Sequence, residues 1–486
     1  MNKISCFLPY AGKEQVEKTV NSLQATGLIE EIRLITTDAT LESLPDCEIL
    51  FVDMPYSSAT LKAIANAAKG EYTLLYTKET TLEMGMFALE RMIHILEDSS
   101  AGMVYADHYQ IADGKQSNAP VIDYQFGSLR DDFNFGSLLL FNTEKLKEAA
   151  GHMKSDYNFA GLYDLRLKLS QHSDLVHINE YLYSEVENDT RKSGEKIFDY
   201  VDPKNRDRQI EMEQACTEHL KEIGGYLAPE FKKIEFSAGN FEYEASVIIP
   251  VRNRIRTIRD AIKSVLMQKT DFKYNLIIID NHSTDGTTEA IDEFKDDERL
   301  IHIVPERTDL GIGGCWNMGV HHPKCGKFAV QLDSDDVYKD ENTLAIMVRA
   351  FYEQNCAMVV GTYMMTDFNM NMIAPGIIDH KEWTPANGRN NALRINGLGA
   401  PRAFYTPVLR EVKVPNTSYG EDYALGLNFS RQYQIGRVYD VVYLCRRWDD
   451  NSDASLDIVK MNGHNLYKDR IRTWELQARI AMNKNK

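Results

Sequence analysis

An acidic run in the second half of the chain has the residue types of a cation site. Asp333-Ser334-Asp335-Asp336 places three carboxylates within four residues. Carboxylates this close repel one another and raise one another's pKa unless they share a cation. Mg²⁺ and Mn²⁺ prefer such oxygens, and either ion commonly bridges one or two carboxylates to a diphosphate. We therefore favour a divalent-cation site over a merely solvated acidic turn.

The residues around this run predict strands that alternate with helices. Short apolar runs typical of buried parallel strands occupy residues 246–250, 276–279, 300–304 and 328–332. Between the first two, residues 258–266 place Ile and Val on one face of an amphipathic helix. This alternation predicts βαβ units and a mainly parallel sheet, so the overall class is α/β.

Polar residues follow several of these strands directly. Arg252 and Asn253 follow the first strand, residues 280–285 follow the second, and the acidic run follows the fourth. Ligands of such sheets bind beyond the carboxyl ends of the strands, so these residues are the candidates for a site. Asp285 taken alone is more simply explained as a helix cap.

Five motifs, taken in order, resemble the family 2 glycosyltransferases. The motifs are Val247-Ile248-Ile249-Pro250 with Asn253; Ile279-Asp280-Asn281 with Ser283 and Asp285; Gly311 with Asn317 and Gly319; Leu332-Asp333-Ser334-Asp335-Asp336; and Gly420-Glu421-Asp422-Tyr423. The resemblance covers roughly residues 242–450. It implies a GT-A fold, which is a nucleotide-binding α/β domain with a D-x-D metal motif.

The resemblance also implies a role for each acidic position. Asp280 is similar to the residue that contacts the nucleotide base, most often uracil, and Asp333 to the residue near the ribose. Asp335 is similar to the ligand of a Mn²⁺ or Mg²⁺ ion, with Asp336 supporting it. Asp422 matches the general base of the Glu421-Asp422 pair. The other donor-binding positions that we expect are Pro250, Asn253, Asn281, Asp285, Gly311, Asn317, Ser334, Arg446 and Arg447.

These roles imply a metal-dependent transfer with inversion at the anomeric carbon. An acceptor hydroxyl is a poor nucleophile until a base takes its proton. A metal neutralises the charge that develops on the departing nucleoside diphosphate. The implied donor is a nucleotide-sugar, most often UDP-linked in this family, and the implied acceptor is a glycan, a lipid-linked sugar or a protein.

The chain departs from the family pattern near Trp316. Many members have Ala-Arg-Asn where this chain has Cys315-Trp316-Asn317. The indole either stacks on a base or packs in the core. Arg446 and Arg447 resemble a basic segment that closes over the diphosphate, although they are also compatible with a surface pair. We do not include His464 among the metal ligands.

Residues 1–190 resemble a second copy of the same fold without its acidic residues. Phe7-Leu8-Pro9 parallels Ile248-Ile249-Pro250, and Tyr163 parallels Tyr423. In this alignment Thr77-Lys78-Glu79-Thr80 replaces the acidic run, and Gly161-Leu162 replaces the Glu-Asp pair. We expect a degenerate domain for scaffolding, acceptor positioning or dimerisation. A second, metal-independent active site is the alternative.

The predicted organisation is therefore two tandem GT-A-like, Rossmann-like domains. Residues 1–190 form the degenerate domain and residues 191–242 a helical linker. Residues 243–486 form the catalytic domain, which ends in a helical segment. A homo-oligomer through the first half is compatible with this organisation.

Composition limits the partners and the compartment. The net charge of −17 repels polyanions, which argues against nucleic acid as a partner. The seven cysteines are scattered and contain no C-x-x-C pair, which is typical of a reduced protein. No apolar run is long enough to span a membrane. We expect a cytoplasmic protein, and a peripheral location at the inner face of the membrane is compatible with this expectation.

Two other functions compete with a single-site transferase. A bifunctional polysaccharide polymerase would need a second active site, which the lost carboxylates at Thr77–Thr80 and Gly161-Leu162 disfavour. A non-catalytic scaffold that binds glycan or nucleotide is disfavoured because the second half carries Asp280, the acidic run and Asp422 together. The sequence leaves the donor sugar, the acceptor and the linkage open.

Overall fold

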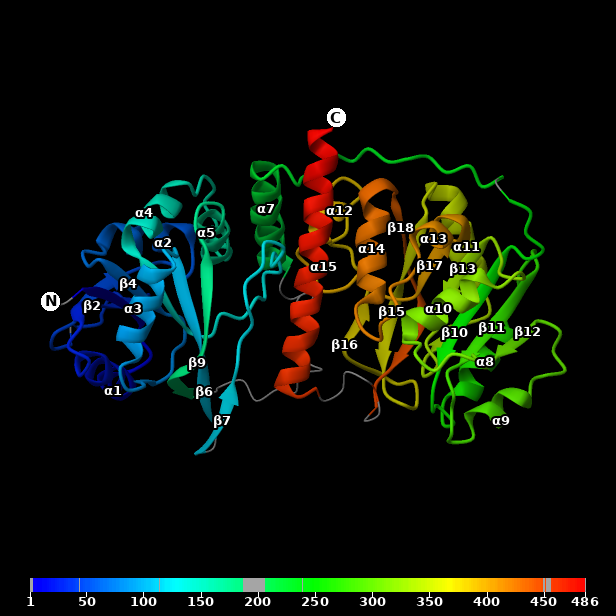
Figure 1. Ribbon diagram of the computed structural model, residues 1–486, viewed down its shortest axis with the longest axis horizontal. Coiled ribbons are helices and arrows are strands. Elements are labelled where there is room, and N and C mark those ends of the chain that lie inside the picture. The colour runs from blue at the N-terminus through cyan, green and yellow to red at the C-terminus, as the bar shows by residue number, and fades with distance from the viewer. Residues whose placement is uncertain are drawn as a thin grey trace. The chain divides into compact units, whose positions relative to one another are not determined.

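The structure, a computed structural model, describes residues 3–42, 44–112, 114–186, 206–237, 239–448, 451 and 456–485. These residues divide into two compact units (Figure 1). The first unit comprises the described residues up to 186 together with 206–226 and 456–485. The second unit comprises the described residues between 227 and 451.

The first unit is an α/β unit. In chain order its elements are β1 (Ile4–Pro9), α1 (Lys13–Gln24), β2 (Ile29–Thr36), β3 (Glu48–Phe51), α2 (Ser58–Ala67), β4 (Tyr72–Tyr76), β5 (Leu82–Met84), α3 (Ala88–Asp98), β6 (Met103–Ala112), β7 (Lys115–Ala119), β8 (Leu138–Asn142), α4 (Thr143–Gly151), α5 (Gly161–Ser170), β9 (Leu175–Val186), α7 (Arg206–Glu222) and α15 (Ile458–Lys484).

The second unit repeats the same succession with two added short helices, α9 and α12. Its elements are β10 (Ala245–Val251), α8 (Ile258–Leu266), β11 (Tyr274–Asp280), α9 (Thr287–Asp292), β12 (Leu300–Ile303), α10 (Ile312–His321), β13 (Phe328–Gln331), β14 (Val337–Tyr338), α11 (Thr343–Gln354), β15 (Met358–Thr366), β16 (Met372–Ile378), α12 (Gly388–Asn391), β17 (Arg402–Tyr405), α13 (Thr406–Val412), α14 (Glu421–Gln432) and β18 (Ile435–Arg446).

The two sheets have the same strand order. The first runs β3-β2-β1-β4-β8-β6-β9-β5, and the second runs β12-β11-β10-β13-β17-β15-β18-β14. In the second sheet β10 pairs in parallel with β11 and β13, whereas β17 is antiparallel to both β13 and β15. The predicted α/β class with two similar sheets is confirmed, and each sheet is mixed because β8 and β17 run against their neighbours.

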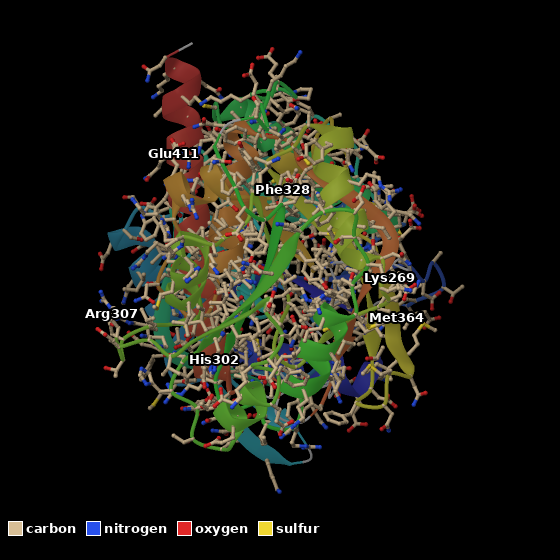
Figure 2. All side chains as sticks on the ribbon, turned by 90° about the vertical axis from the view of Figure 1, so that its right-hand side faces the viewer. Lys269, His302, Arg307, Phe328, Met364 and Glu411 are labelled. Atoms are coloured by element: carbon tan, nitrogen blue, oxygen red, sulfur yellow. The ribbon has the colours of Figure 1, made fainter. Side chains whose placement is uncertain are left out.

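The strand registers align the two units residue by residue. Ile4 of β1 lies beside Tyr72 of β4, and Ala245 of β10 lies beside Phe328 of β13. In Figure 2, which looks onto the second unit, Phe328 marks β13 and His302 marks β12. The central strands are buried on both faces, and every side chain of Tyr274–Asp280 is inaccessible or nearly so. Burial on both faces explains why the sequences of these strands are almost continuous apolar runs.

The last helix, α15, belongs to the first unit, whereas we expected it in the second. Ser128 Oγ donates to Asp469 Oδ2 at 2.9 Å, and Gly127 N donates to Thr473 Oγ1 at 2.9 Å. A Cβ on Gly127 would lie 2.1 Å from the backbone nitrogen of Thr473, so only glycine allows this approach. Asn483 donates to carbonyls that follow α7, beside which α15 runs in Figure 1. Amphipathic periodicity marks a helix but not the surface that its apolar face contacts.

The predicted linker is also divided between the units. Its helix α7 packs against α5 of the first unit, and residues from 227 onward belong to the second. All seven cysteines are free thiols. Among the described residues, no helix combines the length and the apolar character that a membrane span requires.

Candidate active site

A cavity of about 320 Å³ opens where β13 ends in the second unit. We call it the acidic cavity because five carboxylates line it. Its lining consists of Pro250, Arg254, Ile312, Trp316, Gln331, Asp333, Ser334, Asp335, Asp336, Arg402, Phe404, Val414, Glu421, Asp422, Leu425, Cys445, Arg447 and Asn451.

The acidic run forms the turn between β13 and β14 and is fixed by the neighbouring strand β18. Tyr443 of β18 bonds through its hydroxyl to the backbone nitrogen of Asp333 at 3.1 Å. Asp336 Oδ1 accepts from the backbone nitrogen of Arg446 at 2.8 Å. Asp335 Oδ2 lies 3.7 Å from Arg254 Nε and accepts from the side-chain amide of Asn451 at 3.3 Å. The three carboxylates are therefore held together by contacts that only partly neutralise them.

Two carboxyl groups of the run have raised pKa values. Burial raises the pKa of Asp333, and the charge of Asp335 adds to that rise against the opposing effect of Arg402. Burial and repulsion from Asp335 and Asp333 raise the pKa of Asp336 well above its usual range. Among the described residues, no three His, Cys, Asp or Glu side chains are grouped to hold a metal without further ligands. One or two carboxylates suffice when a diphosphate supplies the remaining oxygens.

The Glu421-Asp422 pair begins α14 on another wall of the cavity. Gly420 precedes the helix with a left-handed φ of 80°, which turns the chain so that both acids lie in the first helical turn. Asp422 Oδ1 accepts from the backbone nitrogen of Tyr423 at 2.7 Å. Asp422 Oδ2 accepts from Arg402 Nη1. A carboxylate held by two donors presents a fixed face to the cavity.

Glu421 differs from Asp422 in its protonation state. Burial and repulsion from Asp422 raise the pKa of Glu421 to about 8, against the opposing effect of Arg402. Its Oε2 atom is buried and has no hydrogen-bond partner among the described residues. A pKa of this size keeps the carboxyl group neutral at pH 7 while Asp422 is paired with Arg402.

Arg402 is a site residue that our sequence reasoning missed. Arg402 follows cis-Pro401 at the start of β17, and its Nε donates to Gln331 Oε1 at 2.9 Å. Gln331 in turn donates through Nε2 to Asp333 Oδ1 at 2.8 Å. This chain of contacts joins Asp422 to the acidic run. The antiparallel pairing of β17 with β13 creates it, and no local motif signals such a long-range pairing.

Asn451 is another lining residue that we missed. Its Oδ1 accepts from the backbone nitrogen of Trp448 at 2.6 Å, and its side-chain amide contacts Asp335. The isolated asparagine belongs to no motif, so nothing in the sequence marks it.

The predicted site residues fall into two groups. Those that line the acidic cavity are Pro250, Asp333, Ser334, Asp335, Asp336, Glu421, Asp422 and Arg447. Those outside its lining are Asn253, Asp280, Asn281, Asp285, Gly311, Asn317 and Arg446. Trp316 also lines the cavity, 7% exposed, and its ring lies edge-on to that of Phe404.

Asp280 is completely buried at the end of β11. Its Oδ1 accepts from Ser283 N at 3.0 Å, and its Oδ2 accepts from Thr288 Oγ1 at 2.5 Å. Burial by itself would raise the pKa of Asp280, but hydrogen bonds with His302, Ser283 and Thr288 hold it well below its usual range. The side chain therefore ties the loop after β11 to α9.

Arg446 also faces the protein rather than the cavity. Its side chain is 1% exposed, and Nη1 donates to Asp260 Oδ2 at 2.9 Å. Its Nε donates to the carbonyl oxygen of Asp335 at 2.5 Å. These contacts orient the acidic run and leave Arg447 as the arginine of the pair that lines the cavity.

The remaining predicted residues hold loops around the site. Asn253, at a φ of 54°, accepts from Thr284 N at 2.8 Å, and Asp285 caps Thr287 at 3.0 Å. The side-chain amide of Asn281 donates to the carbonyl of Leu310 at 2.8 Å. Asn317 both donates to and accepts from the backbone of Val414, a lining residue.

Gly311 lies against the segment that precedes α14. A Cβ at Gly311 would meet the carbonyl carbon of Thr417 at 2.7 Å, so a side chain does not fit there.

His464, which we did not include among the metal ligands, lies in α15, within the first unit.

In the first unit a lysine replaces this acidic arrangement. Lys78 Nζ lies 2.6 Å from Glu185 Oε1, and His108 Nε2 lies 3.0 Å from the same oxygen. The Glu185 side chain has no exposed surface, and its other oxygen accepts from Ser137. The turn that follows β4 therefore carries a half-exposed lysine that is paired with a buried carboxylate.

The second unit thus defines an α/β domain whose acidic cavity lies at the carboxyl ends of parallel strands. Residues 246–403 match the family described as glycosyl transferase family 2. This match lies wholly within the second unit.

Curated relatives share parts of the chain. A Rickettsia felis protein named uncharacterized glycosyltransferase is 37% identical over 198 residues, which are 40% of this chain and 31% of the relative. The putative teichuronic acid biosynthesis glycosyltransferase TuaG of Bacillus subtilis is 29% identical, over 26% of this chain and 49% of its own length. The chain thus spans less than half of these relatives' length.

Solved structures resemble part of the chain. Residues 1–349 of S. aureus TarS, in complex with UDP-GlcNAc, are 19% identical to this chain, with a TM-score of 0.37, over 49% of this chain and 72% of that one.

Proposed function

We propose that the second unit is a metal-dependent, inverting glycosyltransferase. It moves a sugar from a nucleotide-sugar, for which UDP is the expected nucleotide, to an acceptor hydroxyl during synthesis of a surface glycan or glycoconjugate. The observation that carries this proposal is that Asp335 and Asp422, from distant segments, line one cavity of about 320 Å³. The family match over residues 246–403 and the names of the relatives support the same reaction class.

Asp422 is the general base of the proposed reaction. The acceptor hydroxyl loses its proton to the Asp422 carboxylate as its oxygen forms a bond to the anomeric carbon. The bond from that carbon to the diphosphate oxygen breaks on the opposite face, and the electron pair leaves with the nucleoside diphosphate. Arg402 positions the base, because it holds one carboxylate oxygen and leaves an electron pair of the group for the proton.

The acidic run holds the donor diphosphate. Asp335, with Asp336 in support, would bind Mn²⁺ or Mg²⁺, and the raised pKa values of Asp333 and Asp336 fit carboxylates that the protein neutralises only in part. When bound, the cation neutralises the charge that develops on the leaving group. Arg447 adds a positive side chain to the same cavity. Trp316 gives it an aromatic wall.

The first unit does not carry out this reaction in our proposal. Thr77, Thr80 and Leu162 stand where the second unit has Asp333, Asp336 and Asp422. Only Glu79 keeps a carboxylate, beside Lys78, so the first unit lacks the base and two of the three acids of the run. We propose instead that it is a degenerate domain. An Asp335→Ala variant that retained transfer would show that a second site exists.

The test is incubation of the full chain with a panel of nucleotide-sugars and Mn²⁺, with products read by mass spectrometry. We expect slow hydrolysis of one donor, or transfer when an acceptor is present, and loss of both in Asp422→Asn. Failure of every donor to react, together with no binding of any nucleotide in calorimetry, would overturn the proposal.

A further inference from the structure

The first unit contains a cavity of about 300 Å³ at the position equivalent to the acidic cavity. We call it the apolar cavity. The strand registers make Thr77, which follows β4, equivalent to Asp333, and Leu139 of β8 equivalent to Arg402 of β17. Leu162 is the second residue of α5, as Asp422 is of α14. Thr77, Leu139 and Leu162 all line the apolar cavity.

Two apolar lining positions keep their residue type in both units. Phe141 in β8 is equivalent to Phe404 in β17, and Leu165 in α5 is equivalent to Leu425 in α14. All four residues line their respective cavities. The first unit therefore keeps the space and the apolar walls of the site but replaces its charged residues.

Most of the other lining residues are apolar, and some of them are adaptable. Phe133 and Phe135 are less than 10% exposed, and Met103 is 1% exposed. Met54 and Met212 also line the cavity. Methionine side chains adjust to irregular apolar ligands, and a cavity of this size with few polar groups is typical of small-molecule sites.

Three of the polar lining groups already have partners. The Tyr56 hydroxyl donates to the carbonyl of Thr77 at 2.5 Å, and the Thr77 hydroxyl donates to the carbonyl of Ser137 at 3.2 Å. Arg166 also lines the cavity, but its guanidinium donates to the carbonyls of Ser128 and Arg130. A sugar or a phosphate would bury hydroxyl or charged groups without adequate partners, at a large free-energy cost.

We propose that the apolar cavity binds the hydrocarbon chain of an amphiphile, whose head group stays at the open side. Arg208, which is exposed, Asp131 and Asn158 contribute the polar lining near the opening. One positive and one negative side chain there give no preference for the sign of the head group. The chain itself, rather than the head group, supplies the affinity, because burial of methylene groups is favourable.

The experiment is calorimetric titration of the full chain with decyl maltoside below its micelle concentration. We expect saturable binding with a Kd on the order of 10–100 µM and none with maltose, which lacks the alkyl chain. Saturating UDP and Mn²⁺ should leave the decyl maltoside affinity unchanged. Absence of saturable binding would overturn the proposal, as would displacement by UDP, which would place the probe in the acidic cavity.

Two variants locate the bound chain. Leu162→Asp restores the residue type of the second unit at a half-buried position in the first turn of a helix, where an acid is tolerated, and should weaken binding at least tenfold. Phe159→Ser, at a lining position that is 39% exposed, should weaken it several-fold. Leu44→Asp is the matched control, because Leu44 is half-buried in the same unit but outside the lining. Equal affinity in all three variants would overturn the proposal.

The test is independent of sugar transfer. Probe binding is measured without any donor, so a failed transferase assay does not affect it. Conversely, an active transferase that binds no decyl maltoside would leave the proposed function intact and reject the apolar site.

Discussion

Arg402 Nη1 donates a hydrogen bond to Asp422 Oδ2, and the same guanidinium reaches Gln331, which contacts Asp333. One arginine thus links the proposed base with the acidic run. In the first unit leucine occupies both equivalent positions, Leu139 and Leu162. The ion pair and the acidic run are present together in one unit and absent together from the other.

Replacement of Arg402 should slow the reaction, because Asp422 and Asp333 lose a positively charged neighbour. We expect Arg402→Leu to lower kcat by about 10- to 100-fold, because Asp422 loses the donor that orients it. Arg402 also lowers the pKa of Asp333 and of Glu421. The acid limb of the pH–rate profile should therefore move to higher pH in the variant, which steady-state assays from pH 5 to 9 would detect.

Arg259→Leu provides a matched control for this measurement. Arg259 lies in α8 of the same unit, is 38% exposed and pairs with Glu293 outside the cavity. The Arg259→Leu substitution should leave kcat and the pH–rate profile unchanged. A lowered rate in Arg402→Leu without any shift of the acid limb would reduce the role of Arg402 to structural support.

Asp335→Asn should remove metal-dependent nucleotide binding. One carboxylate of the pair proposed to hold the ion becomes neutral, so calorimetry with UDP and Mn²⁺ should show at least a tenfold loss of affinity. Treatment of the unaltered chain with a chelator should give the same loss. Asp271→Asn, an exposed residue of the loop before β11, is the control and should bind as the unaltered chain does. Metal-independent UDP binding of equal strength would contradict the metal role.

Glu421 should make the protein less stable as the pH rises. Its pKa is raised from 4.5 to about 8 by burial and by Asp422, so between these values the folded state binds a proton that the unfolded state has lost. The free energy of unfolding should therefore fall across this window as pH increases. Glu421→Gln removes the effect and should stabilise the protein at pH 8 by about 1–3 kcal/mol.

Urea unfolding from pH 5 to 8, without divalent ions, measures this difference. Glu411→Gln, at an exposed position of α13 labelled in Figure 2, is the control and should retain the pH dependence of the unaltered chain. If the Glu421→Gln variant also retained this pH dependence, Glu421 would not be buried as a neutral carboxyl group.

Glu185 should make the first unit more stable as the pH rises, which is the opposite of the effect of Glu421 on the protein. Burial alone would raise its pKa, but His108 and Lys78 lower it from 4.5 to about 2. Its contribution is therefore complete above pH 4.5 and disappears as the pH falls toward 2. Glu185→Gln should cost about 1–3 kcal/mol at pH 7, because Lys78 and His108 lose their shared partner.

Hydrogen exchange of peptides from β8 and β9 would report this loss within the first unit. Glu83→Gln in β5 is the control, because its side chain is exposed. Unchanged protection in Glu185→Gln at pH 7 would contradict the assigned stabilisation.

Local signals predicted much of the second unit. The apolar spacing at 258–266 predicted α8, and the runs at 276–279 and 328–332 predicted β11 and β13 to within two residues at each end. The periodicity reflects burial on one face or on both, which is a local property of each element.

The orientation of polar side chains depended on long-range pairing instead. Arg446 follows the apolar run of β18, but the position of Asp260 in α8 turns its guanidinium inward. Asp280 follows β11 as predicted, yet Thr288 and Ser283 occupy its oxygens. Arg402 belongs to no motif. Such contacts form only when distant elements meet, so the sequence indicated the region of the site better than its exact members.

The attachment of α15 to the first unit has a consequence for synthesis on the ribosome. Residues that complete the second unit emerge before Ser128 and Gly127 can meet Asp469 and Thr473. The second unit can therefore fold while the nascent chain is still growing, whereas the first unit makes its contacts with α15 only after that helix has been translated, although its own strands are translated earlier. Order of translation and order of completion are reversed in this chain.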